Sequence, residues 1–231
     1  MESLAAFLTK AGPIGMTIVA SSVIALFIII ERCWAFRQLR FKDALLPDRL
    51  RKRAVEGDYT QAVAMVHEQR HPLAVALAAV LARLDGSQHP SRGALEKTIA
   101  HVAAREVRQL ERFLPTLFLI SSVTPLLGLF GTVTGMIKAF QAIQHLGGKV
   151  NASVLAGGIW EAMLTTALGL GVAIPAMVVH NYLQGKVHEI VAEIKEESGM
   201  LLDDLEEAGR LETGGKPALV HELKVSHQEA G

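Results

Sequence analysis

The chain has 231 residues, 23 basic and 23 acidic side chains, and a hydrophobic content of 50%. A formal net charge of zero provides no basic surface for nucleic acid, and a mean hydropathy of +0.31 points to a membrane protein rather than a soluble domain. Cys33 is the only cysteine, which excludes an internal disulfide and any cysteine-based zinc or iron–sulfur site.

The first membrane span is predicted at residues 11–36, after a polar segment at 1–10. Uncharged residues run from Ala11 to Ile30, which matches the ~20 apolar residues that a helix needs to cross a bilayer. This stretch is too long for the hydrophobic part of a secretory signal, so we expect a retained helix. Basic residues cluster after it, whereas only Lys10 precedes it. The positive-inside rule then predicts an external amino terminus and a cytoplasmic loop at 37–112.

The cytoplasmic loop carries helix signals throughout. Asp58 and Gln61 have the form of a capping box, which predicts a helix to about residue 70. A second helix is predicted from Pro72 to about Gly86. From Ser91, as the cap, a long helix is expected to continue without a break into the second span, with bends at two prolines, Pro115 and Pro125.

The end of the first loop helix reads His67-Glu-Gln-Arg-His71, which matches the zinc-binding pattern of metalloproteases. Against a metal site, Pro72 disfavours helical geometry at His71, and no third ligand stands out. The favoured interpretation is a solvated helix end without metal or cofactor. A membrane metalloprotease stays as a remote alternative.

The second and third spans are predicted at residues 113–141 and 153–183, joined by an external turn at 142–152. Their small residues are typical of helices that pack closely in lipid, where backbone approach drives association. We expect packing at six positions in particular: Pro125, Gly128, Gly131, Gly135, Gly169 and Pro175. After residue 183 the third helix is expected to continue as a cytoplasmic helix at 184–212, before a disordered tail at 213–231.

Four polar residues of these spans are candidates for function. An acid within a span is costly and should face a bundle interior or a cavity, which singles out Glu161. Thr132, Thr165 and Thr166 could line a polar path or bond to their own helix carbonyls. Glu161 and Thr165 share one helix face, whereas Glu161 and Thr166 lie roughly 140° apart.

Two strings carry a family resemblance. Pro-Leu-Leu-Gly-Leu-Phe-Gly-Thr-Val-x-Gly-Met at 125–136 is followed by Gly-Ile-x-Glu-Ala-Met-Leu-x-Thr-Ala-x-Gly-Leu-x-Val-Ala-Ile-Pro-Ala at 158–176. In this order they closely resemble the MotA/TolQ/ExbB proton-channel family, and the Glu31-Arg32-x-Trp34 ending of the first span is more similar to the ExbB branch. Three spans with a long loop match the ExbB and TolQ branches.

The resemblance implies an all-α membrane protein of the bacterial inner membrane with three transmembrane helices and long cytoplasmic helical extensions. It implies a homo-oligomer, a pentamer, around ExbD- or TolR-like single-span partner helices. Pore threonines then fall on Thr132 and Thr166, and the inward-facing acid on Glu161. The implied function is to use the proton motive force for TonB-dependent transport, through a TonB-like energy transducer, without enzymatic activity. The alternatives are a TolQ-type envelope function and a scaffold that clusters small membrane proteins through its glycine faces.

Overall fold

The computed structural model describes residues 12–39, 46–66, 71–86, 90–145 and 152–211, and these form helices joined by short turns. The helices are α2 (Gly12–Gln38), α3 (Leu46–Glu56), α4 (Tyr59–Val66), α5 (Pro72–Gly86), α6 (Arg92–Leu110), α7 (Leu114–His145) and α8 (Ala152–Glu207). By length and composition, α2, α7 and α8 can each cross a membrane. The predicted all-α fold with three spans is therefore confirmed, and the chain is a multi-pass membrane protein.

The chain divides into two compact units. The first, here called the membrane unit, is built from residues 1–34 and 113–184, and the second, the loop unit, from residues 35–112 and 185–231. Helix α7 extends to His145, and residues 146–151 of the predicted turn lie outside the described residues. The predicted disordered tail lies outside the described residues.

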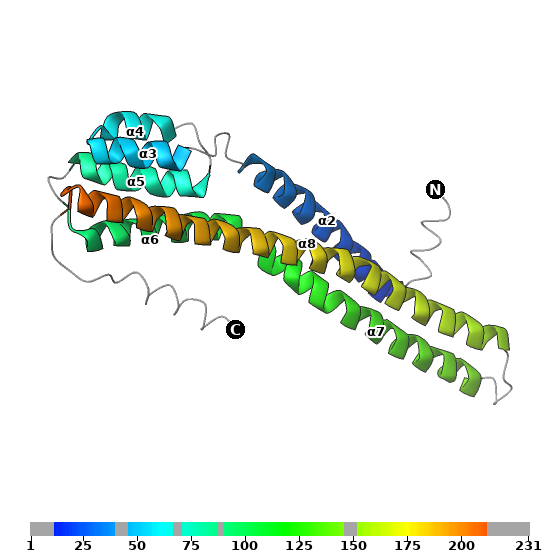
Figure 1. Cartoon of the computed structure of the whole chain (residues 1–231). Helices are drawn as coiled ribbons and strands as arrows, with labels where there is room; N and C mark the ends of the chain where they lie inside the picture. Colours follow the sequence, from blue (N-terminus) through cyan, green and yellow to red (C-terminus); the bar gives the residue numbers. More distant parts are fainter. Residues whose placement is uncertain (1–11, 40–45, 67–70, 87–89, 146–151, 212–231) are drawn as a thin grey trace. The chain divides into compact units, whose positions relative to one another are not determined.

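In the membrane unit, α7 and α8 run side by side as an antiparallel pair (Figure 1). We call their contact the seam, and it is made of small residues. A Cβ atom on Gly131 would lie 2.3 Å from Oγ1 of Thr165, and one on Gly169 would lie 2.5 Å from the carbonyl oxygen of Thr124. The two backbones therefore approach as closely as the absence of side chains allows, which is how helices associate strongly in lipid.

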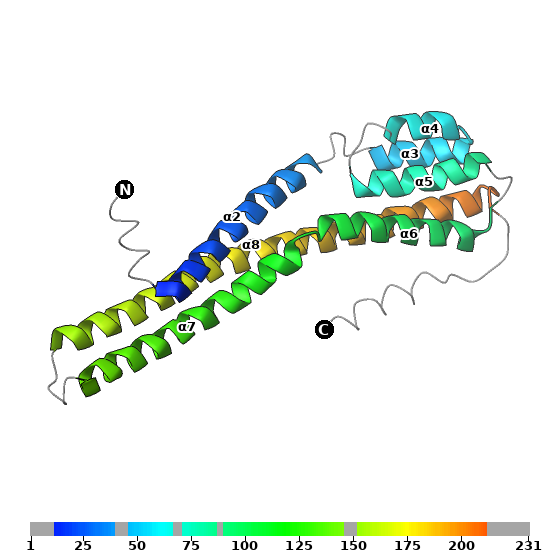
Figure 2. The same cartoon turned by 180° about the vertical axis from the view of Figure 1, so that it is seen from behind.

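The remaining membrane helix, α2, packs against the same pair (Figure 2). Ala25 and Ile28 of α2 form a buried apolar cluster with Leu117 of α7 and Ala176 of α8. The outward faces carry large exposed hydrophobic side chains, among them Phe27, Phe130 and Val178. Such faces suit lipid or a neighbouring helix, and in water they would be costly.

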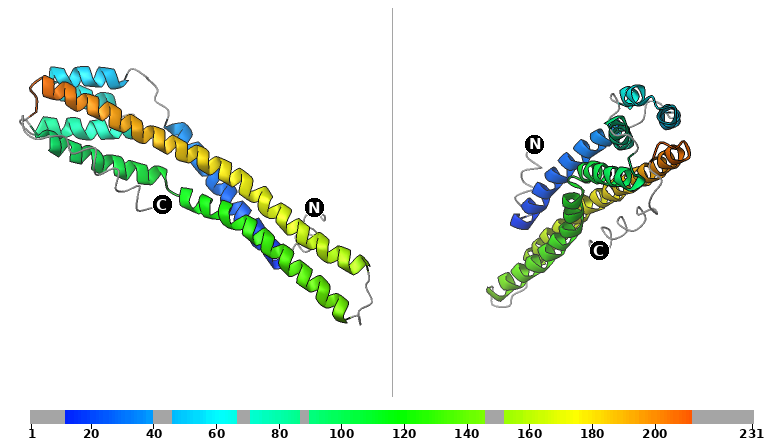
Figure 3. Two further views of the ribbon diagram at one scale, coloured as in Figure 1. Left: turned by 60° about the horizontal axis from the view of Figure 1, so that its bottom comes forward. Right: turned by 90° about the vertical axis from the view of Figure 1, so that its left-hand side faces the viewer.

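The loop unit is a helical bundle. Figure 3 shows α3, α4, α5 and α6 gathered along the carboxyl-terminal part of α8. Leucines of α5 and α6 are buried, and α8 contributes Leu201, Leu202 and Leu205, each at most 1% exposed. The apolar positions at helical spacing after the third span thus make a helix contact, as the sequence predicts.

The expectation of one unbroken helix from Ser91 into the second span is wrong. Helix α6 ends at Leu110, α7 begins at Leu114, and Phe113 between them has a φ of 68° (Figure 2). In a continuous helix the ring of Pro115 would clash with the carbonyl of Glu111. Proline is instead accommodated in a first helical turn, where no amide hydrogen is needed. The serine sits at the expected cap position, although its side chain makes no capping bond.

One of the two bonds of the capping box at Asp58 is present, whereas the Asp58 amide donates to the carbonyl oxygen of Arg53 and not to the Gln61 side chain. The Asp58 carboxylate Oδ1 accepts a hydrogen bond from the Gln61 amide at 3.2 Å, and α4 begins at Tyr59. Before it, Gly57 turns the chain with a φ of 85°, a conformation that other residues rarely adopt. Arg210, which follows α8, donates to the carbonyl oxygen of Glu56 at 3.3 Å.

Arg92 joins the first turn of α6 to the end of α8. Its guanidinium contacts Glu96 at 3.1 Å, Asp203 at 2.8 Å and Glu206 at 2.6 Å, and Glu96 itself is buried. We expect Arg92→Met to lower the free energy of unfolding of the loop unit by about 1 to 2 kcal/mol, because it removes the cation beside a buried carboxylate. Urea unfolding followed by hydrogen exchange of α6 amides measures this loss. Arg83→Met, which removes an exposed side-chain bond to the Thr98 hydroxyl, is the control and should change little.

Candidate functional site

The polar residues of the spans lie along the seam of α7 and α8. Thr165 is 2% exposed, packs against Gly131 and donates its hydroxyl to the carbonyl oxygen of Ala162 at 2.7 Å. Thr166 donates across the seam to the carbonyl oxygen of Gly128 at 2.9 Å. Because successive helical residues are about 100° apart, these two threonines point to opposite flanks of the seam.

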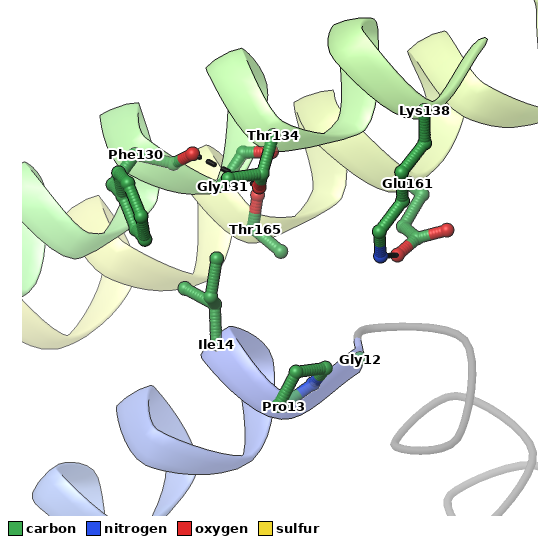
Figure 4. A pocket seen from close by; sticks show the side chains of 9 residues that line it. All are labelled: Gly12, Pro13, Ile14, Phe130, Gly131, Thr134, Lys138, Glu161 and Thr165. Carbon is green, nitrogen blue, oxygen red and sulfur yellow. Dashed lines mark hydrogen bonds and ion pairs between the residues drawn. The ribbon is translucent and has the colours of Figure 1, made fainter. Parts of the chain in front are cut away.

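On one flank, α2 forms a groove with the pair. The groove has a volume of about 250 Å³ and is bounded by the first residues of α2 and by both other helices. Figure 4 shows the side chains that line it: Gly12, Pro13, Ile14, Phe130, Gly131, Thr134, Lys138, Glu161 and Thr165. Two of the predicted site residues, Glu161 and Thr165, thus share this groove, as their spacing on one helix face indicates.

Thr132 and Thr166 lie on the opposite flank. On α7, Gly128 and Gly135 face α8, and Thr132, four residues after Gly128, is rotated about 40° from Gly128 around the helix axis, on the side away from Thr134 and α2. On α8, Thr166 occupies the corresponding place beyond the seam. Both side chains are half-buried. The structure therefore separates the four predicted polar residues into two pairs, one facing α2 and one facing away from it.

The hydroxyls of the second pair are fixed by carbonyl groups. Thr132 donates to the carbonyl oxygen of Leu129 at 2.6 Å, and Thr166 donates to that of Gly128. A threonine oxygen that donates its only hydrogen still offers lone pairs, so it can accept a hydrogen bond from water or from a protonated carboxyl group. This flank can thus present two oriented acceptors to a passing proton donor.

Lys138 is a site residue that the sequence argument missed. Its ammonium lies 3.6 Å from Oε1 of Glu161, and both side chains are visible above Gly12 in Figure 4. In the sequence Lys138 only marks the end of an uncharged stretch. A signal was nevertheless present, because an antiparallel pair that aligns Gly131 with Thr165 brings the lysine beside the acid one to two turns further on.

The second histidine of the zinc-binding pattern, His71, makes contacts that do not involve a metal. His71 is 7% exposed, its Nδ1 accepts a hydrogen bond from the Leu73 amide at 3.4 Å, and its Nε2 lies 3.8 Å from the Glu193 carboxylate. His67 and Glu68 lie outside the described residues. Within the ranges that the structure describes, no three histidine, cysteine or acidic side chains are grouped to hold a metal ion.

Burial lowers the pKa of His71 from 6.5 to about 4, and the Glu193 carboxylate does not offset this loss of solvation. Between pH 6.5 and 4 the unfolded chain therefore binds a proton at His71 that the folded loop unit does not bind. The contribution of neutral His71 to the free energy of unfolding is fully present above pH 6.5, and the free energy falls by about 2 kcal/mol as the pH drops to 4. We expect His71→Gln to flatten this part of the pH profile, as measured by hydrogen exchange of α5 amides. Equal pH slopes in the two proteins would contradict it.

The family profile described as "MotA/TolQ/ExbB proton channel family" matches residues 68–196, more than half of the chain. The chain is 32% identical over 176 residues to biopolymer transport protein ExbB-like 1 of Synechocystis sp., covering 75% of this chain and 68% of that protein. It is 44% identical over 87 residues to the Tol-Pal system protein TolQ of Haemophilus influenzae, 37% of either chain.

A third relative is the biopolymer transport protein ExbB of Salmonella typhimurium, 35% identical over 108 residues, or 47% of this chain and 42% of that protein. The chain thus spans less than half of the length of the TolQ and ExbB proteins it matches here. The matched residues contain the seam, both pairs of polar side chains and the part of the groove that α7 and α8 contribute, whereas Gly12, Pro13 and Ile14 of α2 lie outside the match. The chain therefore belongs to the MotA/TolQ/ExbB proton channel family.

Proposed function

We propose that this chain is the channel-forming subunit of an inner-membrane motor that uses the proton motive force, and that the flank with Thr132 and Thr166 faces the proton path. The observation that carries the proposal is the pair of oriented hydroxyls on one edge of the pair of α7 and α8. A proton donor that moves along this edge finds acceptors at fixed positions.

The proton carrier in this proposal is a carboxylate on a single-span partner helix of the ExbD or TolR kind. Several copies of this chain, five by the family resemblance, surround such helices. Each charge that crosses the membrane releases roughly 2.3 kcal/mol per 100 mV, so a few protons per cycle can perform substantial mechanical work. Glu161 and Thr165 then lie on the far side of the same hairpin, and Glu161 acts on the path as a nearby negative charge.

In this arrangement the amino terminus is outside the cytoplasm and the loop unit is inside. The basic residues that follow α2 support this orientation. Fusions of a reporter enzyme that is active only in the periplasm, placed at residue 1 and at residue 231, test it. Activity at the carboxyl end would overturn the proposed orientation.

The composition of the complex tests the function most directly. The tagged chain is purified in mild detergent from its own host, together with whatever accompanies it, and is examined by native mass spectrometry. Five copies with a small single-span protein support the motor, and self-association without such a protein favours the scaffold. A monomer that retains zinc would favour the metalloprotease.

The branch of the family is a second question. We propose the ExbB branch, in which the motor energises TonB-dependent transport across the outer membrane through a TonB-like protein. The alternative is a TolQ-type subunit that serves envelope maintenance during division. Deleting the gene separates them, because loss of outer-membrane import supports the first and leakage of periplasmic proteins with chained cells supports the second.

A further inference from the structure

The carboxylate of Glu161 lies against the amino end of α2. A Cβ atom on Gly12, the first residue of that helix, would stand 3.2 Å from Oε1 of Glu161, so the carboxylate already occupies the space beside the backbone (Figure 4). Gly12 has a φ of 64°, which turns the chain into the helix at this point. The contact joins α8 to α2, two helices that are distant in the sequence.

The amino end of a helix attracts a negative charge. The first amide hydrogens of α2 have no carbonyl partners within the helix, and the aligned peptide dipoles place a partial positive charge there. A carboxylate beside this end is therefore favoured, whereas an ammonium group is repelled.

Lys138 holds the same carboxylate from the opposite side. Its ammonium is 3.6 Å from Oε1 of Glu161, and the lysine is the more exposed partner at 62% against 36%. The carboxylate thus has a cation on α7 and a helix end on α2. Because Lys138 is largely exposed, its replacement leaves the packing of the seam intact.

We propose that Lys138 is a positioning residue, which keeps the Glu161 carboxylate at the amino end of α2 and thereby fastens α2 to the pair of α7 and α8. Glu161 is then a fixed charge and an anchor for α2, and a proton does not travel through it. Only the statement that a proton does not travel through Glu161 rests on the proposed function. The anchoring of α2 rests on the geometry of the groove alone.

The access of a thiol reagent to the groove measures whether α2 is anchored. Thr134 lines it on α7, so Thr134→Cys gives a thiol that α2 covers, and Cys33 is an exposed thiol on α2 that serves as an internal reference. The full chain is solubilised in mild detergent with its copurifying partners and labelled with a water-soluble maleimide. Peptide mass spectrometry then gives the labelling rate of each cysteine.

If the anchor exists, Lys138→Met and Glu161→Gln each raise the labelling of Thr134→Cys relative to Cys33 at least about threefold, through release of the end of α2. Lys138→Arg keeps the cation and should leave the rate unchanged. The exchange Lys138→Glu with Glu161→Lys should keep the raised rate, since it places an ammonium at the helix end. Unchanged labelling in Lys138→Met and Glu161→Gln, or full restoration by the exchange, would overturn the assignment.

Proton conduction tests separately whether a proton travels through Glu161. In vesicles that contain the whole complex, Glu161→Gln should retain more conduction than Thr132→Val. Loss of conduction in Glu161→Gln that equals the loss in Thr132→Val would show that Glu161 lies on the path. That result would overturn the fixed-charge role. If the parent chain and all of its variants fail to conduct together with the partner, the proposed function itself is rejected.

Discussion

Gly169→Ala is expected to lower the free energy of unfolding of the membrane unit by more than about 3 kcal/mol, although it adds a single methyl group. The new Cβ would lie 2.5 Å from the carbonyl oxygen of Thr124 and 3.3 Å from Cα of Gly128. Both are backbone atoms, so no side chain can rotate to make room. The seam must open along its length, and contact distance is what stabilises helix pairs in lipid.

The same helix provides a matched control. Gly171 has no atom within 4 Å of an added Cβ, so Gly171→Ala makes the same chemical change at a neighbouring, open position. It should be neutral or slightly stabilising, because alanine favours the helix over glycine. Titration with a denaturing detergent, followed by size-exclusion chromatography, measures both variants. Equal midpoints for the two alanines would show that the seam does not stabilise the unit.

The double variant Thr132→Val with Thr166→Val is expected to reduce proton-driven activity at least about tenfold. Valine keeps the shape of threonine and removes the hydroxyl, so the passing donor loses two acceptors, each worth about 1 kcal/mol. Coupled activity in cells and conduction in vesicles are both suitable measurements. Undiminished activity would remove Thr132 and Thr166 from the proton path.

Two controls separate conduction from packing in this test. Thr166→Ser retains the hydroxyl that bonds to Gly128 across the seam, so it should retain most of the activity. Thr134→Val removes a hydroxyl from the same helix as Thr132 but on the groove side, where its bonds go to carbonyl oxygens of its own helix. It should conduct nearly as well as the parent, and a loss equal to that of Thr132→Val would contradict the assignment of the path to one flank.

Local signals predicted the helices well where short-range chemistry decides them. Asp58 with Gln61 marks the start of α4, and Pro72 with Gly86 marks both ends of α5, because capping and proline geometry act within one turn. The charge-free intervals predicted α2, α7 and α8, since a bilayer needs only length and hydrophobicity. The break at Phe113 was missed because a large residue with a positive φ has no composition signal.

The candidate site was harder to predict, for a reason of geometry. The sequence identifies Glu161 as costly in a membrane, and the spacing shows that Thr165 shares its face. Which flank of the seam each residue occupies depends on how α7 and α8 are aligned and on which side α2 packs. Lys138 illustrates this, since it lies 23 positions before Glu161 and its contact with that residue exists only through the alignment of two helices.

The glycines of the seam also restrict how this protein can evolve. Every amino-acid substitution of a glycine introduces a larger residue, and at Gly131 or Gly169 any larger residue meets an occupied space. A change at Gly131 becomes tolerable only after Thr165 has shrunk, because the Thr165 side chain is what fills that space. Substitutions across the two helices should therefore arise in ordered pairs, while Gly171, in open surroundings, is free to vary alone.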